Sequence, residues 1–271
     1  MTEREIIAWI AKRAPNFGKG VRVGIGDDCA VYRPATGEDL VFTTDFTIEG
    51  RHFTQPDYTP REIGYKALAR GLSDIAAMGA TARFALVSLA VPEAGFVKPF
   101  FGGLFGLARK HGVTIAGGDL SQSEKVHCDI VVAGVVPAGK AVLRNGAKVG
   151  DILYVSGPLG TWKKRPQPRL DLAAIVRRDA SACMDITDGL SMDLDRLLRA
   201  SGVTCEITAP PPVMRGATVE DAWCRGEDYE LLVASPKRLP KPFHEIGIVV
   251  AGRPGSPLSP KGWDPFSIRF R

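Results

Sequence analysis

The chain has 271 residues, of which 45% are hydrophobic and 24% are charged, and this composition is ordinary for a soluble globular protein with one large core or two moderate ones. No apolar run reaches the roughly 20 residues of a membrane span, and the N-terminus lacks the pattern of a secretory signal, so we expect no membrane partner. The net charge of +5 comes from scattered basic residues, apart from WKKRPQPR at 162–169, and without a binding-module signature we expect no nucleic-acid partner.

The five cysteines form no CxxC pair. Their spacing argues against a zinc site or a disulfide framework and favours free thiols in a reducing cytoplasm. We therefore expect a cytoplasmic protein.

The first half of the chain predicts helices interleaved with strands. A helix opens the chain, with Thr2 and Glu5 as a capping box and an apolar stripe that includes Ile6 and Ile10. Two more helices are predicted near 60–79 and 98–111, the former capped by Thr59 and the latter stopped by Gly112. Strands are predicted at DLVFTTDF (39–46), ARFALVSLAVP (82–92), VTIAGGD (113–119) and HCDIVVAGVV (127–136).

The second half repeats this mixture after about residue 140. Its predicted helix covers 189–201, and its strands are GDILYVSG (150–157), TCEIT (204–208), YELLVAS (229–235) and IGIVVAG (246–252). Such a mixture indicates an α/β or α+β protein. We expect two domains, residues 1–140 and 141–271.

Four aspartates crowd the segment CMDITDGLSMDLDRLL at 183–198. Asp193 and Asp195 have Arg196 and Arg199 at helical spacing, which favours a solvated helix face. Asp188 precedes the helix and is explained equally well as a helix cap. Asp185, at the end of a predicted strand, is not explained by capping.

Other aspartates stand in similar positions. Asp27 follows a glycine turn, Asp45 stands where a strand is expected to end, and Asp119 follows a strand and two glycines. Asp74 lies within a helix beside the small Gly71, where an exposed helical aspartate is an equally good explanation. If these carboxylates converge they need cations, because two carboxylates 4 Å apart repel by about 4 kcal/mol at an effective dielectric of 20. Oxygen ligands without His or Cys select magnesium or calcium.

Taken together, seven ordered segments resemble the thiamine-monophosphate kinase family, within the aminoimidazole-ribonucleotide-synthetase-like superfamily. The segments are GIGDDCAV, TTDFTIEGRHF, IGYKALARGLSDIAAMGA, AGGDL, RNGAKVGDILYVSGPLG, MDITDGL with DLDRLLRASG, and GEDYELL, and a late KGWDPF is similar to the family's C-terminal motif. The resemblance implies a two-domain fold of mixed sheets flanked by helices. Its N-terminal domain would bind ATP and Mg²⁺ and dimerise, and its C-terminal domain would complete the active-site cleft.

The resemblance implies transfer of the γ-phosphoryl group of ATP onto thiamine monophosphate, assisted by several Mg²⁺ ions, in a homodimer. It assigns to magnesium the residues Asp27, Thr43, Thr44, Asp45, Asp74, Asp119, Asp185 and Asp188. It assigns to ATP the residues Gly118, Asp119, Arg144 and Thr187, and to the thiamine substrate His52, Glu227 and Trp263.

We expect no catalytic general base for this reaction. A phosphate monoester has its second pKa near 6, so the acceptor is already a dianion at pH 7 and positioning with neutralisation is enough. Gly117 and Gly118 would permit close backbone approach to a phosphate. On pattern alone, Arg144 is better explained as a surface residue and His52 as a structural histidine. A packing role explains Trp263 almost as well as a substrate contact, and the role of Glu227 stays open.

The chain departs from the family at several places. The segments 161–182 and 206–225 are shortened, Leu120 replaces a threonine, and Pro265 replaces a histidine. Two alternatives therefore remain: another ATP-using member of the superfamily, such as one similar to aminoimidazole ribonucleotide synthetase, or a nucleotide-binding regulator without catalysis. A selenophosphate synthetase is disfavoured because no cysteine precedes Cys29, and the hydrogenase-maturation member because this chain lacks the C-terminal cysteine.

Overall fold

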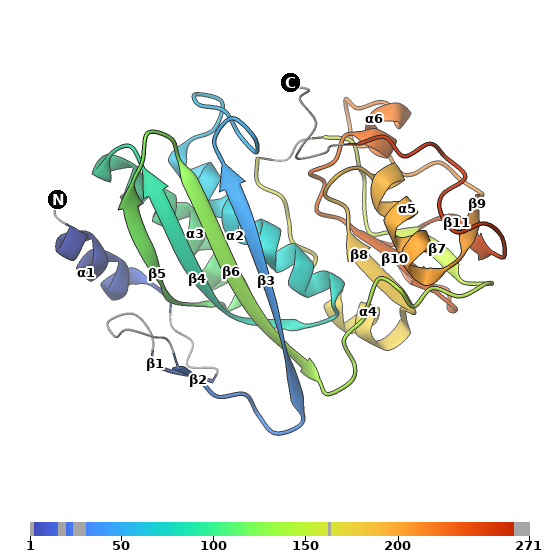
Figure 1. The fold of residues 1–271 in the computed structure, drawn as a ribbon, viewed down its shortest axis with the longest axis horizontal. Helices are drawn as coiled ribbons and strands as arrows, with labels where there is room; N and C mark the ends of the chain where they lie inside the picture. The colour runs from blue at the N-terminus through green and yellow to red at the C-terminus, as the bar shows by residue number, and fades with distance from the viewer. Residues whose placement is uncertain (1–2, 16–19, 24–30, 162–163, 263–271) are drawn as a thin grey trace. The chain divides into compact units, whose positions relative to one another are not determined.

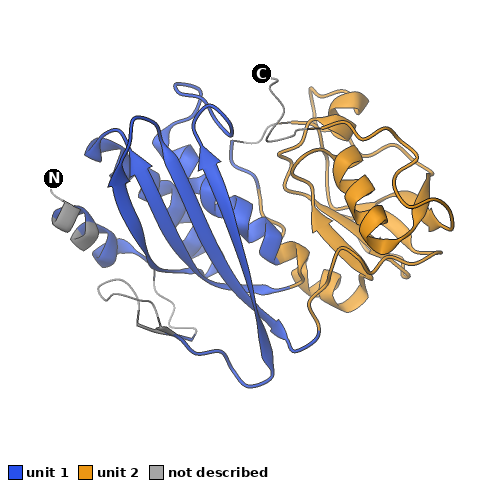
Figure 2. Ribbon diagram, viewed as in Figure 1, with its two compact units in different colours: residues 1–75, 80–139, 164–166 blue, residues 76–79, 140–163, 167–271 orange. Residues whose placement is uncertain are grey.

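The computed structural model describes residues 3–15, 20–23, 31–161 and 164–262, and the chain forms two compact units (Figure 2). Unit 1 comprises residues 1–75, 80–139 and 164–166. Unit 2 comprises residues 76–79, 140–163 and 167–271. The short piece 164–166 therefore belongs to the first unit although it lies within the second half of the sequence.

Unit 1 is built on a four-stranded sheet in the order β3-β6-β4-β5 (Figure 1). Its strands are β3 (Glu38–Ile48), β4 (Thr81–Val91), β5 (Thr114–Gln122) and β6 (His127–Pro137). β4 and β5 are parallel, whereas β6 is antiparallel to both of its neighbours. Two short strands, β1 (Val21–Val23) and β2 (Val31–Tyr32), form a separate antiparallel pair.

Helices α2 (Pro60–Ala77) and α3 (Val97–His111) cover one face of this sheet and lie behind it in Figure 1. Helix α1 (Glu3–Arg13) packs against α3, with the ring centroids of Trp9 and Phe105 6.3 Å apart, and a 3₁₀ turn, η1 (Ala94–Phe96), precedes α3. Thr59 and Glu62 form a capping box at the start of α2, and Gly112 ends α3 in the left-handed conformation. Both predicted helix boundaries are confirmed; Thr2, the predicted cap of α1, lies outside the described residues.

The opposite face of β3 exposes large apolar side chains. Leu40, Phe42 and Phe46 are 36%, 60% and 58% exposed. They alternate with residues that face α2, as the two-residue period of a strand requires. This apolar face of unit 1 is not covered within the described chain.

Unit 2 contains a five-stranded sheet in the order β8-β10-β7-β11-β9, in which every neighbouring pair is antiparallel. The strands are β7 (Ile152–Val155), β8 (Ala182–Asp185), β9 (Thr204–Ile207), β10 (Leu231–Ser235) and β11 (His244–Val250). The helices are α4 (Ala173–Asp179), α5 (Leu190–Ser201) and α6 (Val219–Cys224).

Both faces of this sheet are buried. Leu194 of α5 packs in one cluster with Leu232 of β10, and Val176 of α4 packs in another with Val233 of the same strand. Successive side chains of β10 thus pack into cores on opposite faces of the sheet, which explains why the sequence of β10 is continuously apolar.

The long elements predicted from periodicity are present. The short helices α4 and α6 were not predicted, because seven and six residues are too few for a clear helical period. In the described part of the chain, no helix has the length and apolarity needed to cross a membrane.

Glycines let α2 and α3 cross closely. A Cβ added at Gly64 would lie 2.0 Å from the carbonyl oxygen of Phe100, and one at Gly103 would lie 1.8 Å from that of Arg61. Backbone oxygens cannot yield as side chains do, so both positions require glycine for this crossing.

We expect Gly103→Ala to lower the free energy of unfolding by about 1–3 kcal/mol, because the helices must separate. Gly106, in the same helix, has open space around its missing Cβ. Gly106→Ala should raise stability by about 0.5–1 kcal/mol, because it removes the entropic penalty of a helical glycine. Urea unfolding followed by circular dichroism measures both, and equal stabilisation by the two substitutions would contradict the close crossing.

Candidate functional site

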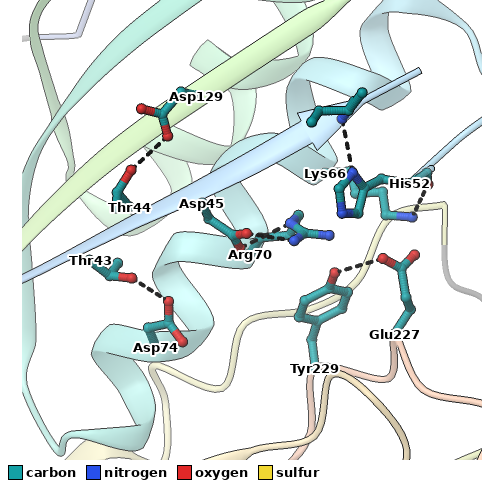
Figure 3. A network of polar contacts seen from close by, with 11 residues as sticks. Thr43, Thr44, Asp45, His52, Lys66, Arg70, Asp74, Asp129, Glu227 and Tyr229 are labelled. Carbon is teal, nitrogen blue, oxygen red and sulfur yellow. Dashed lines mark hydrogen bonds and ion pairs between the residues drawn. The ribbon is translucent and has the colours of Figure 1, made fainter. Parts of the chain in front are cut away.

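In unit 1, two residues of β3 are joined to α2 through carboxylates (Figure 3). The hydroxyl of Thr43 donates to Asp74 at 2.5 Å. Both oxygens of Asp45 accept from Arg70, at 2.9 Å from Nε and 2.5 Å from Nη2. Asp74 is thus not the freely exposed helical aspartate that the pattern allowed; it is half-buried and faces the sheet.

Two strand ends were predicted wrongly. Asp45 lies inside β3, which continues to Ile48, and Asp119 lies inside β5, which continues to Gln122. Threonines and glycines next to these aspartates suggested turns, but pairing with β6 and β4 extends both strands.

The sheet separates the predicted magnesium ligands of unit 1. Thr44 donates to Asp129 of β6 at 2.6 Å, and Asp129 and Asp119 both pair with Ser88 of β4. Paired residues share a face whereas adjacent residues alternate. Thr44 and Asp119 therefore lie on the apolar face of unit 1, and Asp45 lies on the face that α2 covers.

Packing against the neighbouring strand explains why residue 118 is a glycine. Its φ is +146°, and a Cβ would lie 1.9 Å from the carbonyl oxygen of Val87. The neighbouring strand therefore already requires glycine here, whether or not a phosphate approaches.

His52 lies in a turn after β3 that a buried lysine fixes. Its Nδ1 accepts the backbone N–H of Ile48 at 2.9 Å. Its carbonyl accepts from the ammonium group of Lys66 at 2.9 Å, and Lys66 is fully buried, with Nζ 5.0 Å from the ring centroid of Tyr58. The histidine is therefore held by defined partners at both its backbone and its ring.

In unit 2, the segment MDITDG forms a strand end and a turn, as predicted. Asp185 is the last residue of β8 and is 7% exposed. Asp188 does not cap α5: Gly189 precedes that helix and no side-chain cap is formed. Instead, Asp188 accepts from Arg196 at 2.5 Å.

The prediction that Asp193 and Asp195 face solvent is wrong. Both are buried, 0% and 8% exposed, although the predicted pairs with Arg196 and Arg199 form at 2.8 Å and 2.6 Å. Burial and the neighbouring carboxylate of Asp188 raise the pKa of Asp193 to about 6. It is thus mostly ionised at pH 7.

The GEDYELL segment holds two non-glycine residues with positive φ, Glu227 at 58° and Tyr229 at 54°. The tyrosine hydroxyl donates to the Glu227 carboxylate at 3.2 Å (Figure 3), and the N–H of Glu227 donates to the carbonyl of Thr187 at 2.7 Å. Such conformations cost of order 1–3 kcal/mol each, and they cluster at functional sites. Glu227 lies before β10 rather than within it, and this loop fixes it against the 186–189 turn.

Glu230, in the same segment, has a structural role. Glu230 is 5% exposed and accepts from the hydroxyl of Ser156 and from Arg169, both at 2.7 Å. Burial opposes the charge of Arg169, but its contacts with Asp171 and Glu230 raise its pKa. This network ties the shortened 161–182 segment to the sheet of unit 2.

Three further residues were predicted to contact a ligand or a metal ion: Arg144, Asp27 and Trp263. Arg144 is exposed in a turn, and its carbonyl accepts from the hydroxyl of Ser201 at 3.1 Å. Asp27 and Trp263 lie outside the described residues, so their predicted roles remain predictions.

The donor chemistry fits magnesium. Carboxylate and hydroxyl oxygens are hard ligands, which Mg²⁺ prefers over thiolates and imidazoles. Across the described ranges, no group of three or more His, Cys, Asp or Glu side chains could hold a metal ion. A cation at these carboxylates would therefore also need water or phosphate oxygens, as Mg²⁺ commonly does.

Comparison with known proteins decides the family. Residues 26–136 match the model of the AIR synthase related protein N-terminal domain, and residues 158–246 match that of the C-terminal domain. A thiamine-monophosphate kinase from Rhodopirellula baltica is 36% identical in an alignment 258 residues long, and the match covers 85% of this chain and 81% of that relative. The chain belongs to the thiamine-monophosphate kinase family. Its predicted two-domain fold, with mixed sheets flanked by helices, is confirmed.

Solved structures of thiamine-monophosphate kinases agree with this assignment. The crystal structure of the enzyme from Stenotrophomonas maltophilia K279a has a TM-score of 0.81 and 28% identity, and the match covers 96% of each chain. A structure described as AaThiL complexed with AMPPCP and TMP has a TM-score of 0.79 and 31% identity, over 86% of this chain and 89% of that chain.

Sequence reasoning did not find Arg70 and Lys66, which bond to Asp45 and His52, and it assigned Asp193 to the surface although it bonds to the backbone of Thr187. Arg70 stands four residues before Asp74 on α2, so it had a visible helical relation to a predicted ligand. The bond from Lys66 to His52 spans 14 residues, and Asp193 is bonded to the preceding 187–188 turn, and helical periodicity signals neither contact.

Proposed function

We propose that this protein transfers the γ-phosphoryl group of ATP to the phosphate of thiamine monophosphate, giving thiamine diphosphate and ADP. The observation that carries the proposal is the match, over 86% of the chain, to a relative described as complexed with AMPPCP and TMP. The retained carboxylates Asp45, Asp74, Asp119, Asp185 and Asp188 support catalysis rather than a regulator that only binds nucleotide.

When bound, Mg²⁺ would neutralise the negative charge of the two phosphate groups so that they can meet. On the α2 side of the sheet, Thr43, Asp45 and Asp74 would hold it, and in unit 2 Asp185 and Asp188 would do so. Each oxygen of Asp45 has a second lone pair that the bidentate bonds to Arg70 leave open for a cation. The pairing with Arg70 keeps the carboxylate oriented.

We also propose the other contacts that the family resemblance implies. Gly118, Asp119, Arg144 and Thr187 would contact ATP, and His52, Glu227 and Trp263 would contact the thiamine substrate. The fixed conformations of His52 and Glu227 support this, because rigid side chains lose little entropy when a substrate binds. Transfer would be in line and would need no general base. A cytoplasmic location remains a prediction.

The kinase reaction is tested by following ADP formation with and without thiamine monophosphate. ADP should form only when this acceptor is present, and Asp45→Asn should lower turnover about 100-fold or more, because a neutral amide binds Mg²⁺ more weakly than a carboxylate does. Circular dichroism checks that the variant is folded.

Asp39→Asn is the matched control. Asp39 lies in the same strand, is exposed, and accepts the N–H of Gly139 at 2.7 Å, so its substitution should leave turnover unchanged. Turnover by wild type that does not depend on thiamine monophosphate would refute the acceptor, and near-normal turnover in Asp45→Asn would remove Asp45 from the metal ligands.

We further propose that the protein is a homodimer in which a second copy covers the apolar face of unit 1. Phe42 and Phe46 are more than half exposed there, and burying apolar surface contributes about 25 cal/mol per Å². Polar groups of the same face, such as Thr44 and Asp119, would then lie close to the interface.

The double variant Phe42→Ser/Phe46→Ser should therefore sediment as a monomer, whereas wild type should sediment at twice that mass. Val149→Ser is the control, because Val149 is equally exposed, at 60%, but lies in unit 2. A wild-type monomer, or a double variant that remains dimeric, would contradict the proposed interface.

A further inference from the structure

Asp193 lies directly beneath the turn that carries two of the proposed ligand contacts. Its Oδ2 accepts the backbone N–H of Thr187 at 3.0 Å and that of Asp188 at 3.1 Å. Its Oδ1 accepts from Nη1 of Arg196 at 2.8 Å. The carboxylate is fully buried, so solvent cannot replace these bonds.

Arg196 links Asp193 to the side chain of Asp188 as well. The same Nη1 that binds Asp193 also donates to Oδ2 of Asp188 at 2.5 Å. Asp193 therefore fixes the peptide groups of the turn directly and the Asp188 carboxylate through Arg196.

This arrangement is related to one half of a capping box. In a capping box, a side chain from the first turn of the helix accepts the N–H of the cap residue. Here a carboxylate from within α5 accepts two N–H groups from residues that precede it, and Gly189, with φ of 111°, makes the connection without a side-chain cap. The first turn of α5 therefore depends on Asp193 for its link to the 186–189 segment.

We propose that Asp193 is a positioning residue for nucleotide binding: it sets the backbone of Thr187 and the direction of Asp188, and it contacts no ligand itself. The inference rests on the proposed function, in which Thr187 contacts ATP and Asp188 holds the associated cation. Loss of the carboxylate leaves the Thr187 and Asp188 N–H groups unpaired and removes the group that orients Arg196.

Asp195 provides a matched comparison on the same helix. It is buried, pairs with Arg199 at 2.6 Å, and accepts the N–H of Ser256 at 2.9 Å. Its partners are therefore remote from the 186–189 turn in the bonding network. A merely structural effect of removing a buried aspartate–arginine pair should be similar at both positions.

The test compares Asp193→Ala with Asp195→Ala in the full-length protein. Amide hydrogen exchange at Thr187 and Asp188 is measured by NMR, and the affinity for AMPPCP with Mg²⁺ by calorimetry.

In Asp193→Ala these two amides should exchange about tenfold faster or more, and the dissociation constant for AMPPCP should rise about tenfold, as for other groups that orient ligands. KM for thiamine monophosphate should stay within about twofold of wild type.

Asp195→Ala should leave the two amides and the AMPPCP affinity as in wild type and should increase exchange at Ser256. Unchanged exchange at Thr187 and Asp188 in Asp193→Ala would overturn the inference, as would equal loss of nucleotide affinity in both variants. A protein that binds AMPPCP but does not phosphorylate thiamine monophosphate would refute the proposed function and leave this comparison valid.

If Asp193→Ala does not fold, Asp193→Asn takes its place. One amide group cannot offer acceptors both to the two backbone N–H groups and to Arg196, because one of its ends is a donor. The same changes are expected at a smaller size, about threefold. Wild-type exchange and wild-type affinity in Asp193→Asn would overturn the inference.

Discussion

Pairing between carboxylates and arginines is the interaction on which the candidate site depends. Asp45 is bound through both oxygens by Arg70, and Asp188 is bound by Arg196. Carboxylates that are partly removed from water repel other anions strongly, by about 4 kcal/mol at 4 Å and an effective dielectric of 20. The arginines compensate this charge within each unit, so the acidic residues keep defined positions. A reaction that brings two phosphate groups together would then require cations to take over that compensation.

The sheet of unit 1 imposes a second constraint. Adjacent residues of β3 face opposite sides, so Thr44 and Asp45 cannot serve the same side of the sheet through their side chains. Asp119 shares its face with Thr44, next to the apolar residues proposed to meet a second copy of the chain. The proposed dimer interface and the proposed contact of Asp119 with ATP thus lie on the same face of unit 1.

Sequence reasoning predicted the long elements well and the environment of individual residues less well. The strands and the helices α2, α3 and α5 have clear apolar periods, and Thr59 and Gly112 supply local boundary signals that the structure confirms. Asp45 and Asp119 were misplaced because their threonine and glycine neighbours are common in turns, whereas strand length was decided by pairing with distant strands. Asp193 was taken for a surface residue because an arginine three positions later fits a solvated face and a buried pair equally well. Its burial follows from the fold of the 186–189 turn.

A crystal structure with Mn²⁺ and AMPPCP, with manganese located by its anomalous scattering, tests the central claim most directly. We predict manganese bound by oxygens of Asp45 and Asp74. Manganese held by phosphate oxygens and water alone would contradict this assignment.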